Sequence, residues 1–208
     1  MLVTLEGIDG CGKSTQAELL HDHLKVQGIP FVPVREPGGT ELGEDTRKVL
    51  LHKRYSISLQ AELFLYMAAR SELTKTVILP ALKCGKMVIC DRFTDSTLAY
   101  QGYGGGADLS LIRYLSNLAT SGLRPHLTLL LDLPVEEAEI RRISTADRME
   151  SKDYYYHKRV RDGYLEIARR EPQRIKVISA SSPADIQAAE IWNYINALIK
   201  DNQGRGCC

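Results

Sequence analysis

The sequence predicts an α/β protein in which a parallel β-sheet is covered by helices on both faces. Short apolar segments rich in branched residues alternate along the chain with longer segments of helical periodicity. Polar residues, glycine or proline follow most of the short segments, as they commonly follow strands. The chain has 208 residues, 44% of them hydrophobic and 25% charged, which suits one globular domain with a large core.

Five short apolar segments have the pattern of buried strands. They are Leu2–Glu6, Phe31–Arg35, Met87–Asp91, Leu127–Asp132 and Ile175–Ser179. The predicted helices occupy residues 13–27, 41–52, 59–84, 94–101, 109–121, 135–142, 152–171 and 184–200. The segment 59–84 mixes helical spacings, and Pro80 is expected to kink its end. We expect one domain over residues 1–200, followed by a flexible tail over residues 201–208.

Two segments interrupt the alternation of strands and helices. Residues 102–106, with the sequence GYGGG, contain too much glycine for a regular element, so we expect a flexible loop. Residues 141–152 are polar and charged and show no apolar periodicity. Because this second segment lies between two predicted helices, we interpret it as a mobile flap.

A phosphate-binding loop directly follows the first predicted strand. Its residues fit the spacing G-x-x-x-x-G-K-[ST], with a strand before the loop and a helix after it. Glycines let successive backbone N–H groups surround phosphate oxygens, and the N-terminus of the helix adds positive potential. Lys13 is expected to contact the terminal phosphates and Ser14 to coordinate Mg²⁺. The predicted nucleoside triphosphate site consists of Gly7, Ile8, Asp9, Gly10, Cys11, Gly12, Lys13, Ser14 and Thr15.

Charged residues follow the second and third predicted strands, where the loops of a parallel sheet line the ligand crevice. Glu36 belongs to the first of these loops, REPGGT, and either contributes to a site or caps the next helix. Arg47, on that helix, faces either the crevice or solvent. Asp91 is well placed to hold Mg²⁺ near the phosphate loop. Arg92 has the planar fork that binds phosphate, although a surface ion pair would also explain it.

Two further segments carry side chains that suit a nucleobase. One is a pair on a single helix face, Tyr66 and Arg70, which can stack on and hydrogen-bond the same base. The other follows Arg92, and its polar and aromatic residues are Ser96, Thr97, Tyr100 and Gln101. Core packing or solvent exposure would also explain each of these residues when it is considered alone.

The predicted flap carries arginines that can close over a transferring phosphoryl group. They are Arg141, Arg142 and Arg148, and a solvated charged face is the alternative explanation. The carboxylates of Asp147 and Glu150 flank Arg148 and can orient its side chain.

Charge and cysteine content limit the classes of partner. The net charge is +1, so no overall field favours a nucleic-acid polymer. No apolar run is long enough to span a membrane, and the first strand leaves no room for a signal peptide, so we expect a cytoplasmic protein. The cysteines show no zinc spacing, and their odd number is a poor disulfide framework. We expect Cys207 and Cys208 to lie in the flexible tail, with lipidation as the alternative.

Taken together, these motifs resemble the bacterial thymidylate kinases. The resemblance rests on EGIDGCGKST, REPGGT, the helix with Tyr66 and Arg70, DRF, and AYQG, and it extends from Leu2 to about Ile199. It implies a three-layer sandwich of the P-loop NTPase type, with a five-stranded parallel sheet and a short flap. It further implies transfer of the ATP γ-phosphoryl group to dTMP with Mg²⁺, in dTTP synthesis for DNA replication, by a homodimer.

The resemblance also assigns roles to single residues of the dTMP site. Arg92 and Arg47 would contact the phosphate of dTMP, Asp9 the 3′-hydroxyl and Tyr100 the sugar. Tyr66, where the family usually has Phe, would stack on the face of thymine. Arg70 would bind a thymine carbonyl, and Thr97 and Gln101 would bind the edge of the base. The predicted dTMP site consists of Asp9, Glu36, Arg47, Tyr66, Arg70, Arg92, Ser96, Thr97, Tyr100 and Gln101.

The same resemblance places the catalytic arginine in the flap. Bacterial-type members have it there, and the phosphate loop of this chain contains no basic residue before Lys13. Arg148 is expected to act mainly in the transition state, together with one of Arg141 and Arg142. The expected catalytic residues are Lys13, Arg92, Arg148, Arg142 and Arg141, and the expected Mg²⁺ ligands are Ser14 and Asp91.

Two alternatives to a dTMP kinase have sequence criteria of their own. A small GTPase switch would carry the guanine motif N-K-x-D and a D-x-x-G after the third strand, and the sequence contains neither. A kinase for dUMP, dCMP or a deoxynucleoside would share the phosphate loop. The residues expected at the thymine edge favour dTMP over these substrates.

Overall fold

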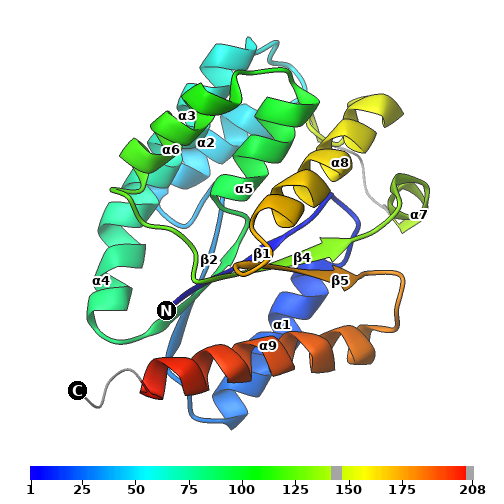
Figure 1. The fold of residues 1–208 in the computed structure, drawn as a ribbon. Helices are drawn as coiled ribbons and strands as arrows, with labels where there is room; N and C mark the ends of the chain where they lie inside the picture. Colours follow the sequence, from blue (N-terminus) through cyan, green and yellow to red (C-terminus); the bar gives the residue numbers. More distant parts are fainter. Residues whose placement is uncertain (142–146, 205–208) are drawn as a thin grey trace.

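The structure is a computed structural model and describes residues 1–141 and 147–204. Its central sheet has five strands in the order β2-β3-β1-β4-β5, and all neighbouring strands are parallel (Figure 1). The strands are β1 Leu2–Glu6, β2 Phe31–Arg35, β3 Met87–Asp91, β4 Leu127–Asp132 and β5 Ile175–Ser179. These bounds agree with the sequence-based ones, so the predicted strands are confirmed.

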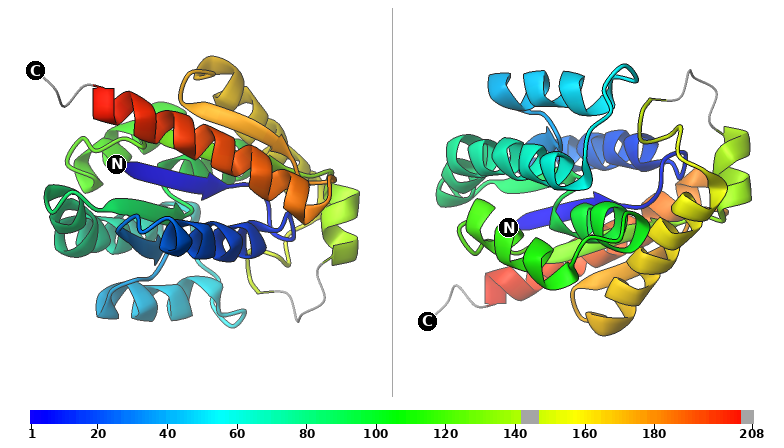
Figure 2. Two further views of the ribbon diagram at one scale, coloured as in Figure 1. Left: turned by 90° about the horizontal axis from the view of Figure 1, so that it is seen from below. Right: turned by 90° about the horizontal axis from the view of Figure 1, so that it is seen from above.

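Helices cover both faces of the sheet and form the predicted three layers. Helices α1 and α9 pack together on one face, and α3, α5, α6 and α8 lie over the other (Figure 1, Figure 2). The α-helices are α1 Lys13–Val26, α2 Glu41–Leu51, α3 Leu59–Leu73, α4 Leu79–Lys83, α5 Thr94–Thr97, α6 Leu109–Ala119, α7 Val135–Arg141, α8 Tyr154–Arg170 and α9 Ala184–Gly204. Since both faces are covered, the central strand β1 is buried along its whole length.

The strand register brings three loops to one edge of the sheet. Asp91 at the end of β3 pairs with Leu5 of β1 on one side and with Arg35 of β2 on the other. The carboxyl ends of these strands therefore lie next to one another. The phosphate loop, the REPGGT loop and the Asp91–Arg92 segment leave the sheet at this edge, which is where open parallel sheets bind ligands.

The glycine-rich segment after α5 differs from its prediction. We expected a flexible loop over residues 102–106, but a π-helix, η2 (Leu98–Gly104), continues through the first three of them. A Cβ atom on Gly102 would lie 2.4 Å from Cδ2 of Leu109, and one on Gly104 would lie 2.7 Å from Cγ2 of Val160. These glycines therefore let η2 pack closely against α6 and α8, a role that local sequence does not separate from flexibility.

The long helical segment over residues 59–84 is divided into three parts. Helix α3 continues into a second π-helix, η1 (Thr74–Ile78), and then into α4. Pro80 lies in the first turn of α4 and has no N–H to donate to the carbonyl four residues earlier. The expected disturbance near Pro80 is thus a wider helical turn just before it.

The predicted flap and the predicted C-terminal tail are only partly described. Helix α9 continues past residue 200 to Gly204, and residues 205–208 lie outside the described residues. Within the predicted flap, Arg141 ends α7, residues 148–151 form turns, and Arg142 lies outside the described residues. In the ranges 1–141 and 147–204, no helix combines the length and apolar character needed to cross a membrane.

Candidate active site

The phosphate loop has the backbone geometry that its glycines permit. Gly7 and Gly12 have φ angles of 141° and 95°, which favour glycine. A Cβ atom on Gly7 would lie only 2.4 Å from the carbonyl oxygen of Leu131. Gly12 directly precedes α1, so the loop passes into a helix N-terminus. This is the strand, loop and helix arrangement that binds phosphate.

Lys13 is folded over the loop that it follows. Its Nζ donates to the carbonyl oxygens of Gly7 and Ile8 at 3.2 and 3.0 Å, and its side chain is nearly buried. A cavity of about 720 Å³, which we call the phosphate-loop cavity, extends from the loop. Its lining includes residues 9–16, Arg35, Glu36, Arg47, Asp91, Arg92, Arg141, Glu150, Ser182, Ala184 and Gln187.

Asp91 and Ser14 line the phosphate-loop cavity and provide oxygen ligands. Oδ1 of Asp91 is buried and has no hydrogen-bond partner among the described residues. Across residues 1–141 and 147–204 no cluster of three or more His, Cys, Asp or Glu could hold a metal ion. Mg²⁺ commonly uses one or two protein oxygens together with substrate phosphates and water, so this pair fits that ion.

Arg92 lies at the junction of the phosphate-loop cavity with a second cavity. Its guanidinium donates to Oδ1 of Asp9 at 2.5 Å, to the Gly7 carbonyl at 2.9 Å and to the Tyr100 hydroxyl at 3.2 Å. Burial disfavours its charge, but Asp9 and the neighbouring tyrosines raise the pKa of Arg92 well above its usual value. The arginine therefore stays a cation fixed between the two cavities.

Asp9 is held as an anion beside Arg92. The Tyr100 hydroxyl donates to its Oδ2 at 2.9 Å. Burial alone would raise the pKa of Asp9, but the charges of Arg92 and Lys13 hold it well below its usual range. Asp9 thus offers only hydrogen-bond acceptors at neutral pH.

Glu6, the last residue of β1, supports the junction at Arg92, and it was not singled out from the sequence. Its carboxylate is fully buried and accepts hydrogen bonds from the Phe93 N–H at 2.7 Å, from Ser96 Oγ at 2.6 Å and from the Tyr164 hydroxyl at 2.9 Å. Burial and the nearby Asp95 carboxylate raise the pKa of Glu6 to about 7. Both hydroxyls also lie within hydrogen-bond distance of Arg92, so Glu6 supports that residue indirectly.

The second cavity, which we call the inner cavity, has a volume of about 80 Å³. Every residue predicted for the dTMP site lines it, and Pro37, Leu51, Asp147 and Met149 complete the lining. Asp9, Glu36, Arg47 and Arg92 line both cavities, so the two adjoin. Arg47 donates to the Pro37 carbonyl at 3.0 Å, and the ring of Tyr66 is half-buried in the lining.

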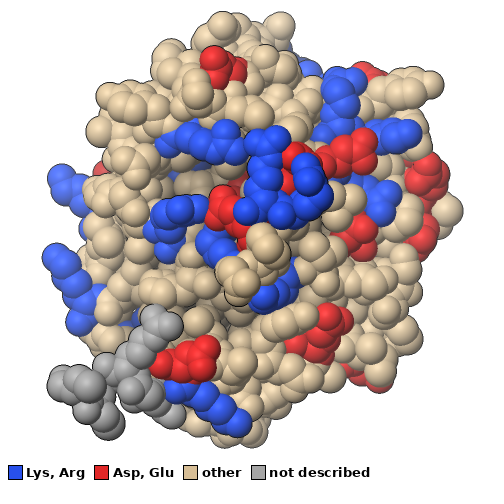
Figure 3. Space-filling model, in the orientation of Figure 1, with Lys and Arg blue, Asp and Glu red and all other residues tan. Residues whose placement is uncertain are grey.

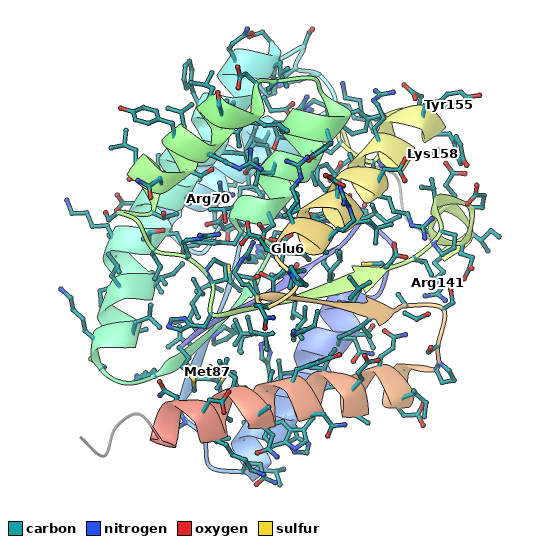
Figure 4. All side chains as sticks on the ribbon, in the orientation of Figure 1. Glu6, Arg70, Met87, Arg141, Tyr155 and Lys158 are labelled. Atoms are coloured by element: carbon teal, nitrogen blue, oxygen red, sulfur yellow. The ribbon has the colours of Figure 1, made fainter. Side chains whose placement is uncertain are left out.

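Arg70 is the most enclosed cation of the inner cavity, with 2% of its surface exposed. It donates from Nε to Glu36 at 2.7 Å, from Nη1 to Thr97 Oγ1 at 2.9 Å, and from Nη2 to the Phe93 carbonyl at 3.0 Å. Burial raises the pKa of Glu36 although Arg70 opposes this shift. Figure 4 shows Arg70 and Glu6 in the interior between the helices and the sheet, whereas Tyr155 and Lys158 lie at the outer end of α8.

The two described flap arginines lie at different places. Arg141 lines the phosphate-loop cavity and donates to the Ala180 carbonyl at 2.9 Å. Arg148 donates to Glu62 at 2.5 Å and to the Leu50 carbonyl at 2.6 Å, which places it behind the inner cavity. A contact between Arg148 and a transferring phosphoryl group would require it to leave both partners, so its catalytic role stays a prediction.

Surface charges of both signs are mixed on the face that Figure 3 shows. In Figure 3, Lys and Arg side chains are interspersed with Asp and Glu side chains on the visible face, in line with the net charge of +1. Recognition of an anionic ligand therefore depends on the cations that line the cavities.

Comparisons with known proteins agree along nearly the whole chain. A family model described as thymidylate kinase matches residues 5–191. The thymidylate kinase of Kosmotoga olearia is 46% identical over 207 residues, which cover 98% of this chain and 100% of that relative. A Synechococcus thymidylate kinase is 52% identical over 200 residues, covering 96% of each chain. The crystal structure of thymidylate kinase from Ehrlichia chaffeensis superimposes with a TM-score of 0.78 and 37% identity, over 94% of this chain and 98% of that one.

Proposed function

The chain belongs to the thymidylate kinase family and phosphorylates dTMP to dTDP, and we propose a division of this reaction between its two cavities. ATP occupies the phosphate-loop cavity and dTMP the inner cavity. The observation that carries the proposal is the junction at Arg92, where the two cavities adjoin and share Asp9, Glu36 and Arg47. A donor phosphate and an acceptor phosphate bound on either side would meet there.

The phosphate loop, residues 7–15, holds the ATP phosphates in this proposal. Lys13 exchanges the carbonyls of Gly7 and Ile8 for phosphate oxygens, which are stronger acceptors for an ammonium group. Ser14 and Asp91 hold the metal ion, for which we propose Mg²⁺. When bound, this ion neutralises charge on the phosphates as the phosphoryl group moves.

dTMP lies across the inner cavity with its phosphate toward the junction. Arg92 and Arg47 bind that phosphate, and Asp9 and Tyr100 line the sugar. The base packs on Tyr66, and its edge faces Arg70, Thr97 and Gln101. The buried hydrogen bonds among these polar side chains support this arrangement, since they fix the pocket before a ligand enters.

The reaction is a direct transfer in which the protein supplies position and charge. Phosphoryl transfer of this kind requires the two oxygens in line with the phosphorus and cations around the equatorial oxygens. Lys13, Arg92 and one flap arginine are the proposed cations. The proposed location of this reaction is the cytoplasm, and its role is dTTP synthesis for DNA replication.

Measuring ADP release with dTMP, dUMP, dCMP and thymidine tests this function. We expect ATP-dependent turnover with dTMP as the preferred acceptor and conversion of one dTMP per ADP. Preferred phosphorylation of another acceptor would refute the assignment of the inner cavity. Tight GDP retention without turnover would instead favour a switch protein.

We also propose that the protein is a homodimer that pairs through α6. Three apolar side chains repeat along one side of this helix, where Leu111, Tyr114 and Leu118 are 46%, 67% and 66% exposed. Phe64 of the neighbouring helix α3 is 59% exposed. Contiguous exposed apolar side chains are typical of protein interfaces. Sedimentation equilibrium should give a dimer mass, and Leu118→Arg should shift it toward the monomer.

A further inference from the structure

Glu62 lies behind the base end of the inner cavity without lining it. It precedes Tyr66 and Arg70 by one and two helical turns of α3, so the three side chains share one face. Only 5% of its surface is exposed. It lines a separate pocket together with Gly104, Tyr156 and Arg159. We therefore expect Glu62 to act on a ligand in the inner cavity through a neighbouring residue.

Both oxygens of the Glu62 carboxylate are engaged. Oε1 accepts from Nε2 of Gln101 at 2.8 Å, and Oε2 accepts from Nη2 of Arg148 at 2.5 Å. The backbone N–H of Arg148 donates to the Leu51 carbonyl and its Nε to the Leu50 carbonyl. The arginine is thus held at the end of α2, and it holds the carboxylate in turn.

A salt-bridged carboxylate can only accept hydrogen bonds. For that reason the Gln101 amide must direct its nitrogen at Glu62, and the usual ambiguity between the two ends of a glutamine amide does not arise. Gln101 lines the inner cavity, and its amide oxygen is the end that Glu62 does not bind. The edge of the base therefore faces an amide whose orientation is fixed.

The sense of that amide distinguishes pyrimidines by their hydrogen-bond pattern. Thymine and uracil carry a donor at N3 and a carbonyl at C4, whereas cytosine carries an acceptor at N3 and an amino group at C4. An amide free to rotate by half a turn would suit either pattern, but an amide fixed at its nitrogen suits only one of them.

We propose that Glu62 is a positioning residue that fixes the Gln101 amide and thereby makes the site reject cytosine. This inference rests on the proposed function, because it takes the inner cavity as the dTMP site. The 5-methyl group lies outside this mechanism, so Glu62 should not affect discrimination between dTMP and dUMP.

The test is the substrate selectivity of Glu62→Gln. Glutamine offers Gln101 either a donor or an acceptor, so the fixed sense of the amide is lost while size is kept. We expect the ratio of kcat/KM for dTMP to that for dCMP to fall by about tenfold or more. The ratio for dTMP to dUMP should stay within about twofold. Glu72→Gln, the same change on the same helix at a side chain that borders neither cavity, is the matched control.

A second variant keeps the test decisive where Glu62→Gln folds poorly. Arg148→Met removes the ion pair that holds the Glu62 carboxylate against Gln101. The carboxylate can then turn away, the amide is no longer fixed, and the dTMP-to-dCMP ratio should fall in the same direction. Because selectivity is a ratio, a change in kcat common to both substrates cancels.

Other outcomes would overturn the inference. If folded Glu62→Gln keeps both ratios, or if both ratios change together, Glu62 only supports the pocket structurally. Absence of dTMP turnover in the unmodified protein would instead reject the proposed function, which the first assay already separates from this inference.

Discussion

The two cavities that meet at Arg92 differ in how their polar side chains are satisfied. On the phosphate-loop side, Lys13 donates only to acceptors of the loop itself, two carbonyl oxygens and Sγ of Cys11, and Oδ1 of Asp91 lacks a partner among the described residues. On the inner side, Arg70 with Glu36 and Glu62 with Gln101 form buried pairs, although Oε1 of Glu36, a residue that lines both cavities, lacks a partner among the described residues. The first side has groups available for a highly charged ligand, whereas the second holds its groups in fixed positions.

This difference between the two cavities allows one site to combine strong binding with selectivity. Phosphate groups are common to all nucleotides, so contacts to them contribute binding and charge neutralisation without distinguishing bases. A site whose hydrogen-bonding groups are fixed and buried rejects a base that leaves them unpaired. We therefore expect substitutions on the phosphate side to change kcat and substitutions on the inner side to change KM and selectivity.

The largest effect is expected from Lys13→Ala. Loss of the cation that follows the moving phosphoryl group should lower kcat by about 10³-fold, while the protein stays folded. Steady-state kinetics with dTMP and a thermal melt would measure both quantities. Nearly normal turnover in the folded variant would contradict the assignment of the ATP phosphates to the phosphate-loop cavity.

The flap arginines should divide between the two sides. The catalytic role that the sequence assigns to Arg148 predicts that Arg148→Ala lowers kcat by about 10²–10⁴-fold with small changes in KM. The contact of Arg148 with Glu62 predicts a different result, because it places Arg148 beside the inner cavity. From the structure we therefore expect Arg148→Ala mainly to raise the KM for dTMP. Arg141 lines the phosphate-loop cavity, and Arg141→Ala should lower kcat by about 10²-fold.

Comparing Arg148→Ala and Arg141→Ala under the same conditions tests which flap arginine acts at which cavity. A large loss of kcat in Arg148→Ala at unchanged KM would mean that the flap brings Arg148 to the phosphates during turnover. A silent Arg141→Ala would leave Arg142 as the second flap cation.

On the inner side, Arg70→Ala should raise the KM for dTMP about 10- to 100-fold, in line with roughly 1–3 kcal/mol for a lost buried hydrogen bond. The KM for ATP should change little, because Arg70 does not line the phosphate-loop cavity. Unfolding temperature serves as the control, since the variant also leaves Glu36 unpaired. Equal changes in both KM values would argue against a base contact.

Glu6, beside the junction, should affect the pH dependence of stability and not the division between kcat and KM. Burial raises the pKa of Glu6 from 4.5 to about 7 in the folded protein, so the folded state binds more protons than the unfolded state between these values. Its contribution to the free energy of unfolding should therefore decrease as pH rises from about 4.5 to 7 and stay constant above. Urea unfolding of Glu6→Gln across this range should lack that decrease, and an identical pH slope in both proteins would contradict it.

Local sequence patterns determined most of the framework. The bounds of all five strands and the order of the helices follow from apolar spacing and from glycine and proline, which act within a few residues. Ten of the residues that line the inner cavity were also singled out from the sequence, through motifs such as REPGGT and DRF at the ends of adjacent parallel strands and through the pair on one helix face. Pro37, Leu51, Asp147 and Met149, which complete the lining, were not singled out for it.

The supporting carboxylates were not predicted, because their partners lie far away in the chain. Glu6 is bound by Tyr164, and Glu62 is bound by Arg148. A signal existed in each case: Glu6 is a charged residue at the end of a buried strand, and Glu62 shares a helix face with Tyr66 and Arg70. Neither signal names a partner, so neither could assign a role.

Local patterns in the sequence were thus sufficient for the parallel sheet, the phosphate loop and most of the residues that line the site. Tertiary structure alone decided that Gly102 and Gly104 serve close packing, that Arg148 binds Glu62, and that Arg92 stands between two cavities. The physical reason is the separation along the chain over which each kind of interaction acts. Backbone preferences and apolar periodicity act between near neighbours in the chain, whereas buried hydrogen bonds and close helix contacts join residues that only the folded chain brings together.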